Sequence, residues 1–347
     1  MPPGERHAPI LVHAHARSGS TLLLEMLSQD PELWAAYEPL QDIRQLPPKE
    51  YAPDVRCRRS EIGYGEPLAS RCPLRDAMLL LALLMCDMLP MIALWYHNFE
   101  IDGHTGGYVP HSGTRWGSAW SPAAQFPDIA ISRTRQYLVQ GQACRQRRGA
   151  IVKTVRMNGD LDAIFRVAST FATKPPLVLH LVREPLSVYA SRKNLSKPFG
   201  IPSTVANGSL RSWAKRTCAA TRHDIATGKA QATGSYELVT FSELLYRPRQ
   251  LVNRIYTRHL NRAVPRAVHE YISSHIKPER GYTGYESQAW QFKYGTSSRN
   301  IERVHNRWRD QLQQWEVHQI ELGCRSSQGQ PLYGSLLKKL QSDAVNI

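Results

Sequence analysis

The stretch of sequence that most limits the possible folds is PPLVLHLVREP, residues 175–185. Its aliphatic residues between 177 and 182 form a nearly unbroken apolar run, which is typical of a parallel strand covered on both faces. Other strand-like segments at 8–16, 149–157 and 235–241 alternate with segments of helical spacing at 21–29, 161–170, 186–194 and 243–260. This alternation predicts an α/β fold of three layers, with a mostly parallel central sheet flanked by helices.

The segment ARSGSTLL, residues 16–23, joins the first predicted strand to the first predicted helix. Such a corner leaves the N–H groups of the first helical turn free, and the helix dipole adds partial positive charge. Gly19 permits close approach of the backbone, Ser20 and Thr21 supply hydroxyl groups, and a guanidinium comes from Arg17. The pattern predicts a cradle for phosphate or sulfate, while an ordinary N-capped helix explains this motif alone equally well. No lysine follows the glycine, so the loop is not of the GxxxxGK[ST] type.

A second corner follows the strand at 175–185, in the segment HLVREPLSVYASR. Arg183 lies at the carboxyl end of that strand, and Ser191 follows eight residues later, with a predicted helix start between them. Ligands of open α/β sheets bind at the carboxyl ends of strands. Two corners of this kind suit a ligand with two separate phosphate groups, and the pair favours an anion site over a simple capped helix.

The charge balance of the chain agrees with an anionic ligand without identifying it. Lys and Arg total 44 against 29 Asp and Glu, which gives a net charge of +15. Such a surface favours binding of nucleic acid, glycosaminoglycan, acidic lipid or a phosphorylated nucleotide, or is simply a solvated basic surface.

The length of 347 residues, of which 42% are hydrophobic, permits a large core. We expect one domain over residues 1–347, with irregular insertions at about 44–75 and 97–128.

Six widely spaced cysteines contain no CxxC pair, which disfavours a zinc cluster. Their even number permits three disulfides in a secretory compartment, and buried free thiols explain the spacing equally well.

The segment 77–95 is long enough to span a membrane. Asp87 and Pro90 interrupt it, so a buried helix ending near Asp87 is the preferred interpretation.

These motifs resemble those of the Golgi carbohydrate sulfotransferases. Their 5′-phosphosulfate loop is similar to ARSGSTLL, and their 3′-phosphate motif is similar to LVREPLSVYASR. The segments YEPL, CDM, IVKTVR and SSRNIERVHNRWRDQLQQWEVHQIELGC also resemble family segments in the same order. The likeness extends from about residue 9 to 335 and is strongest to the galactose, N-acetylgalactosamine and N-acetylglucosamine 6-O group. Residues 44–75 and 97–128 depart from the family pattern and would surround an acceptor; FSELLYRP at 241–248 departs as well.

The resemblance implies 3′-phosphoadenosine 5′-phosphosulfate (PAPS) as the sulfuryl donor and no metal. The residues implied to hold the 5′-phosphosulfate are Arg17, Ser18, Gly19, Ser20 and Thr21. Arg183 and Ser191 would hold the 3′-phosphate, and Ser298 and Arg299 would close over the nucleotide. Arg299 is almost equally well interpreted as a surface arginine.

The resemblance further implies transfer to a hydroxyl of a glycan or glycosaminoglycan, with the 6-O position expected, in the Golgi lumen. Nucleic acid is not an expected partner, and membrane association is expected only through an anchor outside these residues. The alternative function is a PAP- or polyanion-binding protein of the sulfotransferase fold without catalytic activity. A P-loop nucleotide kinase would need the lysine that the first loop lacks.

The predicted catalytic base is Glu38. Pro39 holds this residue out of helical geometry, where YEPL returns the chain toward the loop. An ion pair with a nearby arginine is the alternative role for Glu38, and Asp42 is the second candidate for the base. Lys153 and Arg156 flank the site and could contact the sulfate or the acceptor, or form salt bridges at the end of a strand. We interpret His13 and His15, which precede the loop, as structural.

Overall fold

The computed structural model describes residues 7–40, 58–59, 70–71, 73–90, 108–111, 117–120, 137–155, 157, 159–171, 175–193, 209–231, 234–276 and 301–325. Five strands form one sheet: β1 (Ile10–Ala14), β2 (Leu33–Tyr37), β7 (Gly149–Thr154), β8 (Leu177–Val182) and β9 (Tyr236–Thr240). Their order is β2-β7-β1-β8-β9, and every neighbouring pair is parallel. The predicted parallel sheet is therefore confirmed.

The strand order fixes where a ligand can bind. After β1 the chain crosses to β2 at one edge of the sheet, whereas after β8 it continues to β9 at the other edge. The two connections leave neighbouring strands in opposite directions, which opens a crevice at their carboxyl ends. Both predicted phosphate corners, one after β1 and one after β8, border this crevice.

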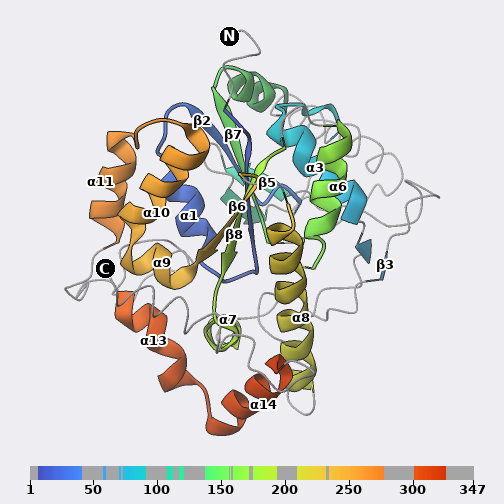
Figure 1. Cartoon of the computed structure of the whole chain (residues 1–347), viewed down its shortest axis with the longest axis vertical. Coiled ribbons are helices and arrows are strands. Elements are labelled where there is room, and N and C mark those ends of the chain that lie inside the picture. The colour runs from blue at the N-terminus through green and yellow to red at the C-terminus, as the bar shows by residue number, and fades with distance from the viewer. Residues whose placement is uncertain are drawn as a thin grey trace.

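Helices cover both faces of the sheet (Figure 1). One side carries α1 (Ser20–Leu27), α9 (Phe241–Tyr246), α10 (Pro248–Ile255), the π-helix η3 (Tyr256–Leu260) and α11 (Arg266–His275). The other side carries α3 (Pro73–Leu84), α6 (Leu161–Phe171) and α8 (Ser209–Lys229). Successive side chains of β1 point to opposite faces of the sheet and so contribute to both cores. Ile10 and Val12 pack toward α1, whereas Leu11 packs toward α3 and α6. The three-layer α/β fold predicted from the sequence is confirmed.

A third apolar cluster joins α7 (Pro185–Lys193) and α8 to α14 (Gln314–Cys324), near the end of the molecule that carries α13 (Ile301–Gln311) (Figure 1). The disulfide Cys218–Cys324 links α8 to α14 within this cluster. A second disulfide, Cys86–Cys144, links the chain just after α3 to the helical segment 137–145. Cys57 and Cys72 lie outside the described residues. The disulfide interpretation therefore holds for four of the six cysteines.

Two regions differ from the helices and loops expected from the sequence. The segment 243–260 is not one helix but α9, α10 and η3, because Pro248, the first residue of α10, has no N–H to continue α9. The insertions at 44–75 and 97–128 lie largely outside the described residues. Their described parts include two antiparallel pairs, β3 (Arg58–Arg59) with β4 (Ser70–Arg71), and β5 (Tyr108–His111) with β6 (Gly117–Trp120). Within the described chain, no helix combines the length and apolarity needed to cross a bilayer.

Candidate functional site

The loop between β1 and α1 is shaped for close approach of a ligand to its backbone. Arg17 and Gly19 both have positive φ, 73° and 91°. A Cβ on Gly19 would lie 2.5 Å from the ring of Phe241, so only glycine fits this turn. Ser18 is fully buried, and its Oγ has no hydrogen-bond partner among the described residues. A buried hydroxyl beside the N-terminus of α1 is thus available to an anion.

The second corner is joined directly to this loop. Arg183 Nη1 donates to the carbonyl oxygen of Arg17 over 3.0 Å, and Arg17 Nε donates to Ser191 Oγ over 3.1 Å. The guanidinium of Arg183 also stacks over the ring of Phe241, 4.0 Å from its centre. The three residues predicted to hold two different phosphate groups therefore form one connected cradle at the crevice between β1 and β8.

The electrostatics of this cradle favour an anion. Burial lowers the pKa of Arg183 to about 10, and the positive charge of Arg17 acts in the same direction, against the opposing effect of Glu184. The guanidinium still carries its proton at neutral pH, but its charge is held in an environment that disfavours it. A bound phosphate would offset that penalty, because an opposite charge nearby favours the protonated form.

A buried ion pair lies on the other side of the loop. Lys153 of β7 is only 1% exposed, and its Nζ donates to Glu38 Oε1 over 2.6 Å and to Thr21 Oγ1 over 3.2 Å. The same ammonium lies 3.7 Å from the ring centre of Tyr37, whose hydroxyl is 2.9 Å from Thr21 Oγ1. Glu38 has a positive φ of 44°, and its N–H donates to the carbonyl oxygen of Lys153. A carboxylate, an ammonium and a hydroxyl thus meet at the start of α1.

The structure brings together the predicted residues that it describes, and Lys153, predicted to flank the site, lies at its centre. Glu38 does form an ion pair, as in its alternative interpretation, but its partner is this lysine. Of the two roles predicted for Lys153, the salt bridge near the end of a strand is the one that the structure contains. A lysine inside the apolar strand GAIVKT needs such a partner. Ser298, Arg299, Asp42 and Arg156 lie outside the described residues.

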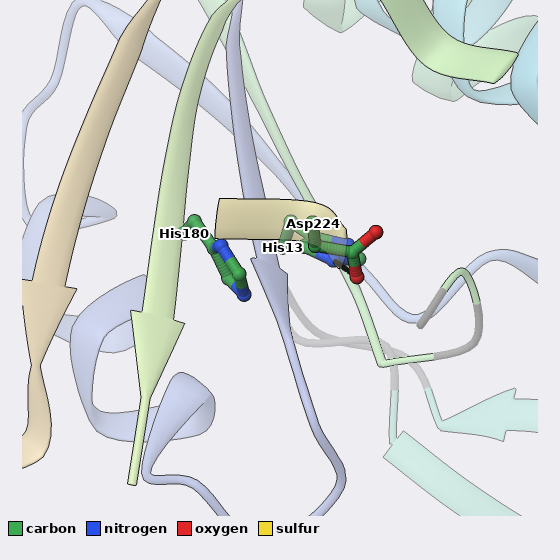
Figure 2. A group of neighbouring side chains, drawn as sticks. All are labelled: His13, His180 and Asp224. Carbon is green, nitrogen blue, oxygen red and sulfur yellow. Dashed lines mark hydrogen bonds and ion pairs between the residues drawn. The ribbon is translucent and has the colours of Figure 1, made fainter. Parts of the chain in front are cut away.

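Three further buried polar residues meet between the sheet and α8: His13, His180 and Asp224 (Figure 2). His13 and His180 are direct neighbours on β1 and β8, and their ring centres are 4.8 Å apart. His13 Nε2 donates to Asp224 Oδ2 over 3.0 Å, because the carboxylate can only accept. Asp224 also accepts the N–H groups of Gly159 and Leu161 at the start of α6.

This group has the residue types of a metal site, with its ligand atoms all within 4.8 Å of one another. Its hydrogen bonds argue for a different role. If His13 Nε2 bound a metal, its Nδ1 would have to carry the proton, and Nδ1 is buried with no acceptor among the described residues. His180 Nδ1 is already 2.9 Å from the hydroxyl of Tyr236. The group is best described as a polar cluster that links β1, β8, β9, α8 and the start of α6.

The solved structures to which this chain is similar include sulfotransferases. No protein-family model matches the sequence, and no curated protein sequence matches it. The sulfotransferase domain of the Synechococcus PCC 7002 olefin synthase has 17% identity and a TM-score of 0.44, covering 92% of this chain and 96% of that one. The sulfotransferase domain of the curacin biosynthetic pathway has 13% identity and a TM-score of 0.43, covering 90% and 96%. A sulfotransferase from Mycobacterium tuberculosis has 15% identity and a TM-score of 0.37, covering 78% and 72%. At these values, a functional assignment depends on the residues of the site.

Proposed function

We propose that the protein transfers a sulfuryl group from PAPS to a hydroxyl of a glycan or glycosaminoglycan, at the 6-O position. The observation that carries this proposal is the single cradle formed by Arg17, Arg183 and Ser191 at the crevice between β1 and β8. Two guanidinium groups and a helix N-terminus in one place suit a nucleotide with phosphates at both ends of its ribose. The motif resemblance of both corners supplies the identity of that nucleotide.

The residues present fit such a donor. The first turn of α1, with the hydroxyl of Ser18 and the side chain of Arg17, would hold the 5′-phosphosulfate. Arg183 and Ser191 would hold the 3′-phosphate, and their bonds to Arg17 keep the two ends of the cradle in register. Gly19 preserves the turn of this loop, because a Cβ there would meet the ring of Phe241.

The ion pair beside the loop supplies the groups that the reaction needs. The acceptor hydroxyl attacks sulfur, the bond from sulfur to the 5′-phosphate oxygen breaks, and Glu38 accepts the hydroxyl proton. Lys153 already contacts both Glu38 and the loop through Thr21, so its ammonium can stabilise negative charge on the transferring group. No described residue other than Glu38 combines a carboxylate with direct contact to this lysine.

One observation favours the alternative, a PAP- or polyanion-binding protein without activity. The 2.6 Å ion pair with Lys153 occupies the carboxylate that would act as base. This ion pair makes the carboxylate a weaker base, and a catalytic role would use its second oxygen, Oε2. For the cellular setting we propose the Golgi lumen, where the disulfides Cys86–Cys144 and Cys218–Cys324 would persist.

Incubation with radiolabelled PAPS and a panel of glycans tests transfer directly and separates the two functions. We expect labelled glycan from the wild type, whereas PAP binding without transfer to any member of the panel would support the alternative.

The donor site is tested with Arg183→Ala. This variant should weaken the binding of PAP much more than the binding of adenosine 5′-phosphosulfate, since the latter lacks the 3′-phosphate. The matched control is Arg166→Ala, which removes an exposed guanidinium on α6. Equal losses for both ligands would remove Arg183 from this role.

A further inference from the structure

The short helix α7, which carries Ser191, is held at both ends by the C-terminal helices. Near its start, the His305 imidazole of α13 lies 3.6 Å from the Glu184 carboxylate, and Ser187 Oγ donates to the carbonyl oxygen of His305. Near its end, α14 provides the carboxylate of Glu316. These contacts place two helices from the far end of the chain directly against the predicted 3′-phosphate corner (Figure 1).

Glu316 makes the stronger of these attachments. Its carboxylate is 3% exposed and accepts from Lys193 Nζ over 2.7 Å and from the hydroxyl of Tyr189 over 3.1 Å, both on α7. It also accepts the backbone N–H of Gln313, which closes the capping box of α14. Burial alone would raise the pKa of Glu316, but the hydrogen bonds from Lys193, Gln313 and Tyr189 outweigh it and lower that pKa. The carboxylate is therefore a charged anchor between α14 and α7.

The geometry of α7 transmits this anchor to the cradle. Tyr189 and Lys193 are four residues apart, so they lie on one face of the helix and both reach Glu316. Ser191 lies between them in sequence and therefore on the opposite side, where it accepts from Arg17. The ring of Tyr189 packs against Trp213 of α8, and Cys218–Cys324 ties α8 to α14. The rotation of α7, and with it the position of Ser191, depends on the bonds to Glu316.

We propose that Glu316 is a positioning residue for the 3′-phosphate, a role that rests on the function proposed above. It does not touch the ligand. It fixes α7 so that Ser191 stays aligned with Arg17 and Arg183, and it thereby sets how much the 3′-phosphate contributes to nucleotide affinity.

The test compares two ligands that differ only by that phosphate, PAP and adenosine 5′-phosphate. Isothermal titration gives both dissociation constants for the wild type, for Glu316→Gln and for the control Glu321→Gln, an exposed carboxylate on the same helix. We expect Glu316→Gln to weaken PAP about tenfold, the size of one charge-assisted hydrogen bond, while adenosine 5′-phosphate stays within about twofold. The control should change neither.

A second variant covers the case in which Glu316→Gln does not fold. Tyr189→Phe keeps the ring against Trp213 and removes only the hydroxyl bond to Glu316, so it should lower the ratio of the two affinities in the same direction. Equal weakening of both ligands, or no change in either, would overturn the positioning role. A wild type that binds PAP no better than adenosine 5′-phosphate would instead overturn the proposed donor site itself.

Discussion

Replacing Glu38 by glutamine removes the charge from one half of a buried ion pair and leaves its shape. Lys153 has a side chain only 2% exposed, so its ammonium cannot turn to water for compensation. The glutamine oxygen can still accept from Nζ, which limits the loss to the lower range for a charge-assisted hydrogen bond, about 1.5–2 kcal/mol. At about 2.1 cal/mol/K per residue, a domain of 347 residues has an unfolding entropy of about 0.7 kcal/mol/K, so the unfolding midpoint should fall by about 2–3 °C.

The expected effect on catalysis is larger than the effect on stability. Loss of a general base typically lowers the rate about 10²–10⁴-fold, which equals about 2.7–5.5 kcal/mol of transition-state stabilisation. Affinity for PAP should change little, because the variant keeps the loop and both arginines of the cradle. Turnover with labelled PAPS at a temperature well below the midpoint, with scanning calorimetry and PAP titration, measures all three quantities separately.

A double variant tests whether Glu38 balances the charge of Lys153. Glu38→Gln with Lys153→Met removes both charges and should recover much of the stability lost in the single variant. Its turnover should stay low, because it lacks both the proposed base and the ammonium proposed to stabilise the transferring group. Glu25→Gln is the matched control, since Glu25 lies on α1 and accepts from Tyr271 away from the ion pair. Turnover of Glu38→Gln within a few-fold of wild type, or recovery of turnover in the double variant, would refute the assignment of Glu38 as the base.

Three further changes test the surroundings of the site. Gly19→Ala should lower the free energy of unfolding by about 2–4 kcal/mol, because alanine is strained at a φ of 91° and its Cβ would meet Phe241. Urea unfolding measures this loss, and a value below about 1 kcal/mol would contradict the geometry. Burial and the charge of a neighbouring histidine lower the pKa of His180 from 6.5 to about 3, so the unfolded chain binds the extra proton and stability falls as pH drops below 6.5. Between pH 7.5 and 5.0 this extra proton lowers the free energy of unfolding by about 2 kcal/mol. His180→Gln should abolish that loss, and an unchanged pH dependence in the variant would show that His180 does not cause it. Cys218→Ser breaks the bond to Cys324 and should lower stability by about 2–4 kcal/mol under oxidising conditions, whereas no difference from wild type would mean that the bond does not form.

The sequence predicts the parts of this molecule that depend on local pattern. The strand at 177–182 is recognisable because an unbroken apolar run is typical of a strand covered on both faces. The turn at Gly19 is recognisable because small residues lie between a predicted strand and a predicted helix. The break at Pro248 was also present in the sequence, but helical spacing on both sides of it hid the interruption. In each of these cases the residues that indicate the structure are close neighbours in the sequence.

The pairings that build the site are not local and could not be predicted in the same way. Lys153 reaches Glu38 across 115 residues, because β7 inserts between β2 and β1 in the sheet. His13 meets Asp224 across 211 residues, and only the register of β1 and the position of α8 decide that contact. No periodicity in the sequence specifies which strand neighbours which, so these partners required the structure.

The strand order also explains why the two halves of the site can act together. Glu38 follows β2, Lys153 lies in β7, the loop of residues 15–19 follows β1, and Arg183 follows β8. Four consecutive neighbours in the sheet therefore each supply one component of the site. Of these components, the loop after β1 is central, because it contacts the Glu38–Lys153 ion pair through Thr21 at the start of α1 and the cradle through Arg17. A ligand that spans the loop would therefore meet the ion pair and the cradle at once. The positive φ of Arg17 and of Gly19 turns the loop tightly enough for one short segment to contact both sides.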